Sequence, residues 1–407
     1  MKSNGLLYVY VRGDLYQQMR AIANSVVIAR ILNATLVVPI LLAKSSHEEI
    51  SQFGNIFSEE HFIETLKDDV NIFRQANFTV TSDTLEHAPP DHRTLNVDWY
   101  LQNVAPVLQG EGVAVLDHFL LSLARDLPEV YQVQPLALVR LANSTICTRK
   151  NEKKGGPLWQ RLRCRVLYHA LLFTSETLGL GANAVERLHA EGPYVALHLS
   201  FQDRNMLRST CVYDSETAQM IQEWFATHHI RVQSDSGAAN HQKLEGLCPL
   251  SPNEVTRILQ AISIGNHTNV YVGGSCDKVE QLLTPLRSAF PGKVVSRCDL
   301  LDSSMAPISS HLMQAIDYIV SLESDFFMTN KRSSIAVLLR GHRFYMGAQK
   351  ETYQPFVPAL LPALAQGAAG QEELRQRVRE HRKQVAELPI KSSRWHFYDR
   401  PWECVCH

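Results

Sequence analysis

Short apolar runs alternate with amphipathic stretches along most of the chain, which is the pattern of an α/β protein. Residues 6–11 form a strand-like run, and residues 17–32 carry apolar residues at helical spacing. Residues 35–39 return to a strand-like pattern. A strand–helix–strand opening of this kind is typical of a doubly wound sheet with helices on both faces.

The same alternation resumes after residue 190. The run 194–201 predicts a buried parallel strand, because it is almost wholly apolar, follows Gly-Pro and leads into a polar segment. Further strands are predicted at 112–116, 269–272 and 293–296, and helices at 61–66, 99–108, 158–173, 183–189, 216–227, 255–264, 278–289, 311–320 and 333–340, the last ended by Gly341. The pattern thus predicts two α/β units, 1–190 and 191–348. A C-terminal extension and tail, 349–407, follows and carries a charged surface helix at 372–388.

Composition narrows the class of partner. The 407 residues carry a net charge of −1, and this balance gives no electrostatic argument for binding to nucleic acid or to an anionic membrane. The most apolar region, 26–43, is interrupted by Arg30, Asn33 and Pro39, which argues against a membrane span.

The cysteines and glycosylation sequons favour a secretory lumen. None of the eight cysteines forms a CxxC pair, and disulfides and buried free thiols both remain compatible with their spacing. Four Asn-x-Ser/Thr sequons occur, at Asn33, Asn77, Asn143 and Asn266. No secretory signal precedes the first strand, so a lumenal protein would require a longer precursor.

A set of motifs in order along the chain resembles the plant O-fucosyltransferase-like glycosyltransferases, which are related to the rhamnogalacturonan rhamnosyltransferases. Each motif is short, and together they are specific. They are LNATLVVP at 32–39, LRCRVLYHAL at 162–171, YVALHL at 194–199, EGLCPLSP at 245–252, IVSLESD at 319–325, GHRFY at 341–345 and ECVC at 403–406.

The resemblance implies a GT-B fold, in which two Rossmann-like domains face each other across a cleft. It implies that the first domain is the acceptor side and the second binds the nucleotide sugar. It also implies an inverting, metal-independent transferase without a cofactor, whose donor is GDP-fucose or UDP-rhamnose and whose acceptor is a glycan or protein hydroxyl. Family members are type II proteins of the Golgi, anchored by an N-terminal helix that this sequence lacks.

The strand at 194–201 departs from the family at charged positions. Without a metal, guanidinium groups, backbone N–H groups or helix N-termini must stabilise the leaving diphosphate, and a base must accept a proton. The family run is His-Leu-Arg-Phe-Glu, whereas this chain has Ser200 for the arginine and Gln202 for the glutamate. Arg204 and Arg208, just past the strand, are the nearest replacements for the lost charge; a solvated loop is the alternative interpretation of both.

The first glycine-rich turn departs as well. The family pattern is Gly-Gly-Leu-Asn-Gln, and Gly13, Leu15 and Gln17 match it. Asp14 replaces a glycine and Tyr16 replaces the asparagine. A side chain at position 14 would hinder a close approach of the backbone to a ligand.

These observations define the candidate site. The catalytic candidates are His198, Ser200 and Arg204, and the donor-binding candidates are Gly13, Gln17, His198, Ser200, Gly273, Gly274, Ser321, Ser324 and Asp325. Each has a structural alternative. His198 could be a satisfied core histidine, and Asp325 a turn or capping residue. His342 and Arg343 could be partners of a helix C-terminus, and Arg163 and Arg165 salt-bridge partners.

The segment 321–325 follows a strand-like stretch and precedes helix 333–340, so we expect it to meet the 13–17 turn and the end of strand 194–201 at one interdomain cleft. Two functions remain open: an active glycosyltransferase, or a catalytically weak relative that binds a glycan or a partner protein.

Overall fold

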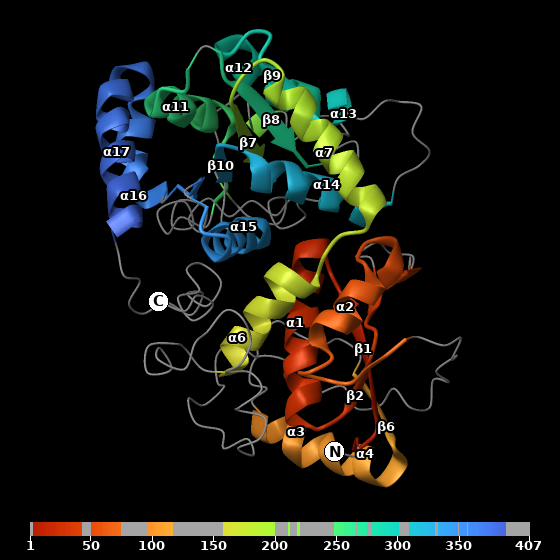
Figure 1. The fold of residues 1–407 in the computed structure, drawn as a ribbon. Helices are drawn as coiled ribbons and strands as arrows, with labels where there is room; N and C mark the ends of the chain where they lie inside the picture. Colours follow the sequence, from red (N-terminus) through yellow and green to blue (C-terminus); the bar gives the residue numbers. More distant parts are fainter. Residues whose placement is uncertain are drawn as a thin grey trace.

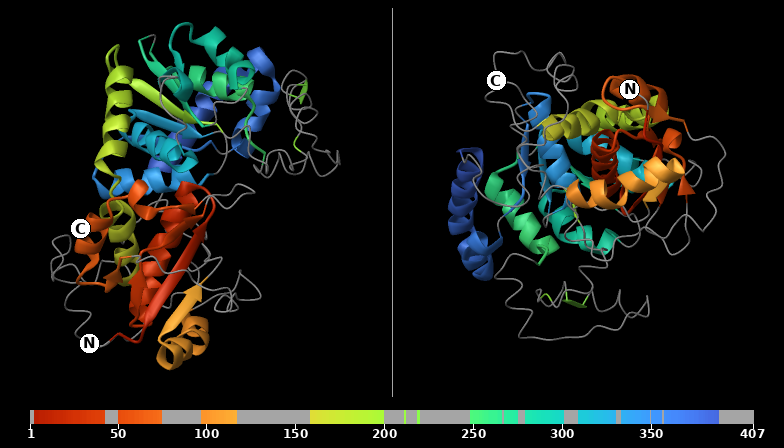
Figure 2. Two further views of the ribbon diagram at one scale, coloured as in Figure 1. Left: turned by 90° about the vertical axis from the view of Figure 1, so that its right-hand side faces the viewer. Right: turned by 90° about the horizontal axis from the view of Figure 1, so that it is seen from below.

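The computed structural model describes residues 3–42, 50–74, 97–116, 158–199, 211, 218–219, 248–265, 267–274, 279–300, 309–329, 333–348, 350–355 and 357–387. These residues form two α/β units, one above the other in Figure 1, each built on a largely parallel sheet. The left view of Figure 2 shows the same two-lobed shape from the side. The α/β class with two sheets is therefore confirmed.

The first sheet is centred on β1 (Leu6–Arg12). Its other strands are β2 (Thr35–Val37), β3 (Ile40–Leu42), β4 (Ile50–Ser51), β5 (Ile72–Phe73) and β6 (Val113–Leu116). Both β2 and β3 pair with β1 in parallel, although Pro39 separates them. Proline lacks the N–H that a ladder requires, so the strand predicted at 35–39 ends at Val37, and β3, which follows Pro39, was not predicted.

The helices of the first unit are α1 (Leu15–Ile31), α2 (Glu59–Leu66), α3 (Val97–Asn103), α4 (Ala105–Glu111) and α6 (Leu158–Arg165), with a 3₁₀ turn at Phe53–Asn55 and the π-helical turn η5 (Val166–Ala170). Two of them begin at side-chain caps, Asp14 for α1 and Ser58 for α2. The helix predicted at 99–108 is in fact two helices, because Pro106 begins a new one. The helix predicted at 158–173 ends its regular part at Arg165 and continues only as η5.

The second sheet is wholly parallel, in the order β11-β10-β7-β8-β9. Its strands are β7 (Tyr194–His198), β8 (Asn269–Gly273), β9 (Val294–Ser296), β10 (Phe326–Thr329) and β11 (Glu351–Tyr353). The sequence pattern did not predict β10 or β11. The strand at 194–201 is shorter than predicted, ending at His198.

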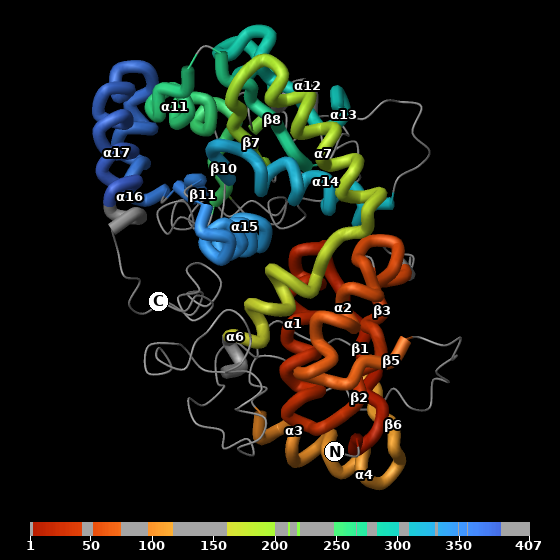
Figure 3. Tube along the Cα trace, viewed as in Figure 1, coloured from red at the N-terminus to blue at the C-terminus, as the bar shows by residue number. Residues whose placement is uncertain are grey.

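The helices of the second unit are α7 (Ser175–His189), α11 (Pro252–Ile262), α12 (Val279–Ala289), α13 (Arg297–Leu300), α14 (Ser310–Glu323), α15 (Ser334–Tyr345), α16 (Val357–Ala365) and α17 (Gln371–Glu387), with a 3₁₀ turn at Gly367–Gly370. Figure 3 traces the chain from α6 in the first unit to α7 in the second. Because α7 packs along α14, residues from Thr174 onward lie with the second unit, although they precede residue 190, the predicted boundary between the units. The charged helix α17 packs its narrow apolar stripe against α11 and α16. The helix predicted at 216–227 lies almost entirely outside the described residues.

The end of α15 corrects one prediction. Gly341 does not stop this helix, which continues to Tyr345. The left-handed glycine that follows its C-cap, Met346, is Gly347, at φ +67°. Arg343 is buried in the last turn and is held by several carbonyl groups, so the turn is fixed past Gly341.

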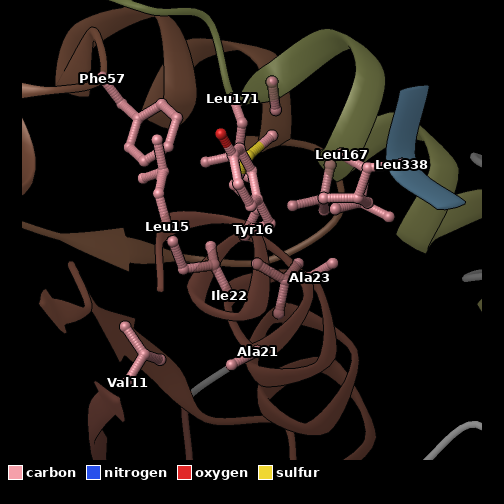
Figure 4. Packing of buried hydrophobic residues seen from close by; sticks show 14 of the residues in the cluster. Val11, Leu15, Tyr16, Ala21, Ile22, Ala23, Phe57, Leu167, Leu171 and Leu338 are labelled. Atoms are coloured by element: carbon pink, nitrogen blue, oxygen red, sulfur yellow. The ribbon is translucent and has the colours of Figure 1, made fainter. Parts of the chain in front are cut away.

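One hydrophobic core runs through both units. Alternate residues of β7 point to opposite faces, so Tyr194 and Ala196 join the core shared with the first unit, whereas Val195 and Leu197 join a second core under α11, α12, α16 and α17. Figure 4 shows part of the shared core, where Leu15 and Tyr16 at the start of α1 lie with Leu171 and with Leu338 of α15. The units therefore meet through packed side chains. Among the described residues, no helix combines the length and hydropathy needed to cross a membrane.

Candidate active site

The carboxyl ends of three adjacent strands lie side by side in the second sheet. His198 at the end of β7 is in register with Gly273 of β8 on one side and with Thr329 of β10 on the other. From the first unit, Tyr16 presents its ring edge-on to the His198 ring, with 6.0 Å between the ring centroids. The 13–17 turn and the end of β7 thus meet, which is the edge at which open α/β sheets bind ligands.

The 13–17 turn is shaped by a capping box. The Asp14 carboxylate accepts a hydrogen bond from the Gln17 N–H at 2.8 Å, and the Gln17 side-chain oxygen accepts one from the Asp14 N–H at 3.2 Å. Gly13 adopts φ +113°, and a Cβ there would come within 2.2 Å of that same Gln17 oxygen. Asp14, a departure from the family pattern, is therefore the N-cap of α1. The structure gives Gly13 and Gln17 local roles, and their donor-binding role stays a prediction.

Tyr16, a residue of this turn, has a buried side chain. Burial, followed by the nearby carboxylates of Asp317 and Asp14, raises the pKa of its phenol well above the usual value. The phenol therefore stays protonated and acts as a hydrogen-bond donor at physiological pH.

A buried carboxylate, Asp317 of α14, holds the glycine turn after β8. It accepts hydrogen bonds from the Tyr271 hydroxyl at 2.5 Å, the Gly274 N–H at 3.0 Å and Nη1 of Arg297 at 2.7 Å. A Cβ on Gly273 would lie 3.1 Å from the Asp317 carboxylate, and Gly274 adopts φ +120°. The backbone of Gly274 thus favours glycine, and a side chain at Gly273 would crowd this carboxylate.

Sequence reasoning missed Asp317 and Arg297. The signal for Asp317 was present, because it is a charge between Ile316 and Tyr318 on the apolar face of a predicted helix. A carboxylate in that position is rarely buried without a partner. No comparable signal pointed to Arg297.

The N-terminus of α15 opens at the same edge of the sheet. Thr329 ends β10, is fully buried, and its hydroxyl has no hydrogen-bond partner among the described residues. Ser333 caps α15 by accepting a hydrogen bond from the Ala336 N–H. A helix N-terminus beyond the carboxyl end of a strand is a favourable place for a phosphate group.

Ser321, Ser324 and Asp325 do not join this site, contrary to the prediction. They lie at the end of α14 and precede β10, which places them at the amino edge of the sheet, opposite His198. The Asp325 carboxylate accepts a hydrogen bond from the Tyr194 N–H at 2.9 Å, at the start of β7. The Ser324 hydroxyl donates to the Ser321 carbonyl. Asp325 thus has a structural contact at the start of β7, at the amino edge of the sheet.

Arg343 and His342 also have structural roles. The Arg343 guanidinium donates to the carbonyls of Ser321, Ser324 and Glu351, and burial lowers its pKa to about 10. His342 Nδ1 lies 3.0 Å from the Tyr318 hydroxyl, and burial lowers its pKa to about 4. Both residues secure α15 against α14.

Arg165 of the 162–171 motif has a structural role as well. Arg165 pairs with the Asp69 carboxylate at 3.2 Å and donates to the Thr65 carbonyl. Arg163 is buried at 2% exposure. Ser200, Arg204 and Arg208 lie outside the described residues, so their proposed roles stay predictions.

Comparison with known proteins places the chain in a family. The model of the GDP-fucose protein O-fucosyltransferase family matches residues 6–346. The chain belongs to the GDP-fucose protein O-fucosyltransferase family. As a fucosyltransferase-family glycosyltransferase, it is 33% identical to O-fucosyltransferase 29 of Arabidopsis thaliana, over 99% of this chain and 70% of that protein. It is 30% identical to Rhamnogalacturonan I rhamnosyltransferase 1 of Arabidopsis thaliana, over 99% of this chain and 79% of that protein.

Solved structures similar to this O-fucosyltransferase-family chain include other fucosyltransferases. POFUT1 in complex with GDP is 13% identical, with a TM-score of 0.41, over 87% of this chain and 99% of that one. The fucosyltransferase NodZ from Bradyrhizobium is 10% identical, with a TM-score of 0.38, over 84% of this chain and 92% of that one. The resemblance inferred from the motifs is confirmed by the family match.

Proposed function

We propose that this protein transfers a deoxyhexose, fucose or rhamnose, from a nucleotide-sugar donor to a hydroxyl group of a glycan or protein, with inversion and without a metal. The observation that carries the proposal is the meeting of the 13–17 turn with the carboxyl ends of β7, β8 and β10, at the Tyr16–His198 contact. The second unit is then the nucleotide-sugar side and the first unit the acceptor side.

The donor diphosphate would dock at the N-terminus of α15. There the helix dipole and the N–H groups of its first turn would stabilise the charge that develops on the leaving group. The Gly273–Gly274 turn, held by Asp317, would lie beside it. Arg204, with Arg208 as the alternative, would supply a guanidinium from the segment after β7. His198 would lie at the reacting end, where the acceptor proton must leave.

A second function is favoured by one observation: Ser200 and Gln202 stand where the related enzymes carry an arginine and a glutamate. Loss of a transition-state charge partner costs on the order of 10²–10³ in rate. On this alternative, the protein binds a glycan or a partner protein with little or no turnover.

A donor panel separates the two functions. The natural protein is incubated with GDP-fucose and with UDP-rhamnose, each with and without a mixture of glycan and peptide acceptors, and release of GDP or UDP is measured. Acceptor-dependent release supports the transferase. Specific binding of an acceptor without release from either donor supports the binding protein.

The site of action that we propose is the Golgi lumen, as a type II membrane protein when an N-terminal anchor is present. The disulfide between Cys211 and Cys248 and the disulfide-bonded state of Cys164 and Cys298 support an oxidising compartment. Asn33, whose side chain is exposed, is the sequon to test first. Expression with a secretory leader should give a protein whose gel mobility shifts on glycosidase treatment, and Asn33→Gln should remove part of that shift. Unchanged mobility together with eight titratable thiols would instead assign the protein to the cytosol.

A further inference from the structure

Gln314 of α14 holds the first turn of α1 across the boundary between the units. Its side-chain oxygen Oε1 accepts a hydrogen bond from the Leu15 N–H at 2.6 Å. Its backbone carbonyl accepts one from the Tyr16 hydroxyl at 3.1 Å. Leu15 is fully buried and Tyr16 nearly so. Loss of either hydrogen bond would therefore leave a buried donor that water does not reach, which is costly.

The Leu15 bond involves a group that a helix cannot satisfy by itself. The first N–H groups of a helix have no partner within it. In α1 the Asp14 side chain accepts a hydrogen bond from the Gln17 N–H, and the Gln314 side chain from the second unit accepts one from the Leu15 N–H. The start of α1 is thus completed by a residue almost three hundred positions away in the chain.

One face of α14 makes hydrogen bonds at both glycine turns, the one at Gly13 and the one at Gly274. Gln314 and Asp317 are one helical turn apart, and Asp317 binds the Gly274 N–H after β8. Tyr318, the next residue, lies 6.2 Å from the Tyr16 ring. One rigid helix therefore fixes the Gly13 turn of the first unit and the Gly274 turn of the second relative to His198.

We propose that Gln314 is a positioning residue for the sugar transfer, and this inference rests on the proposed function. By holding the Leu15 N–H, it sets the Gly13–Gln17 turn and the Tyr16 ring against the end of β7. Reacting groups must be held to within a fraction of an ångström for efficient transfer, so a loosened turn should lower the rate of the chemical step more than donor binding.

Three variants test the role. Gln314→Met keeps the length of the side chain and removes the acceptor for Leu15, while the backbone carbonyl that binds Tyr16 remains. Gln314→Glu keeps an acceptor oxygen. Gln371→Met is the matched control: it makes the same change on α17, where the Gln371 amide bonds Arg257 far from α1.

Two readouts are measured on the whole protein. Amide hydrogen exchange of the segment 13–19 should be faster in Gln314→Met and close to natural in both Gln314→Glu and Gln371→Met. For transfer from the active donor, Gln314→Met should lower kcat about tenfold, with the donor KM changed by less than about threefold. Gln371→Met should keep kcat near the natural value, even though its unfolding free energy falls.

The outcomes are distinguishable. Unchanged exchange in Gln314→Met, or a kcat equal to that of Gln371→Met, overturns the positioning role and leaves the transferase standing. A natural protein that transfers no sugar from either donor contradicts the proposed function, and the positioning role with it.

Discussion

The Asp317 carboxylate accepts a hydrogen bond from the Gly274 N–H at 3.0 Å, so a buried charge on α14 shapes the glycine turn beside His198. The same carboxylate is paired with Arg297, whose side chain is only 10% exposed. Taking both ions out of water is costly, so the pair is poor evidence for stability by itself. Its position beside the turn agrees with a role in shaping the site.

Asp317→Asn tests that arrangement. The change leaves Arg297 buried without a counter-charge and should lower the unfolding free energy by about 3–5 kcal/mol, measured by urea denaturation. Asp317→Asn combined with Arg297→Met should recover part of the loss, because no unpaired charge is then buried. A loss below about 1 kcal/mol in the single variant would contradict the buried pair.

Arg343→Met tests whether the arginine of the GHRFY motif stabilises the fold or binds the donor. The guanidinium is held by carbonyls of three segments, so its removal should cost at least about 3 kcal/mol of unfolding free energy. Nucleotide affinity per folded molecule should stay within about twofold of natural, because Arg343 lies at the amino edge of the sheet. A selective loss of nucleotide affinity with normal stability would mean that Arg343 contacts the donor.

His342 makes stability depend on pH in the acid range. Its pKa is about 4 in the folded protein and about 6.5 in the unfolded chain, so between these values the unfolded state binds more protons. The unfolding free energy should therefore fall as the pH drops from about 7 to about 4, by up to about 3 kcal/mol from this residue, and change no further from it below about 4. His342→Gln should show a shallower fall in urea titrations across this range. The same slope in both proteins would contradict the lowered pKa.

Ser200→Arg with Gln202→Glu tests whether the site is weakened. A guanidinium binds a diphosphate through two hydrogen bonds, whereas serine offers one neutral donor. Donor affinity and kcat should rise most in the double variant, because the glutamate balances the new charge, with stability no lower than in Ser200→Arg. A natural protein that already binds and transfers as well as the double variant would show that another residue, with Arg204 the first to test, supplies the charge.

The sequence predicted most of the scaffold because long apolar runs and capped helices leave strong local signals. The helix predicted at 255–264 is present as α11, which begins at a capping box formed by Ser251 and Glu254. The 321–325 segment was misplaced because β10 has only four residues and was not predicted. The prediction placed a strand before residue 321, whereas the strand follows residue 325. The segment was therefore expected at the carboxyl edge of the sheet, but it lies at the amino edge.

Local sequence patterns could not predict contacts between segments that are distant in the chain. Neither Gln314 nor Arg297 differs in sequence context from an ordinary surface residue, and their roles arise only when α14 meets α1 and α13. The Gly13 turn and His198 were brought together correctly, because the rule that ligands gather at the carboxyl ends of parallel strands needs only strand order and direction.

The central claim is that a nucleotide-sugar donor binds at the carboxyl edge beside His198. Thermal and urea unfolding with GDP and with UDP, on the natural protein, Thr329→Val and Ser324→Ala, tests it most directly. The account predicts that one nucleotide, at about 100 times its Kd, stabilises the natural protein by about 2.7 kcal/mol. Thr329→Val, at the carboxyl edge, should weaken binding, whereas Ser324→Ala, at the amino edge, should leave Kd unchanged. No stabilisation by either nucleotide, or a Kd that changes only in Ser324→Ala, would contradict the account.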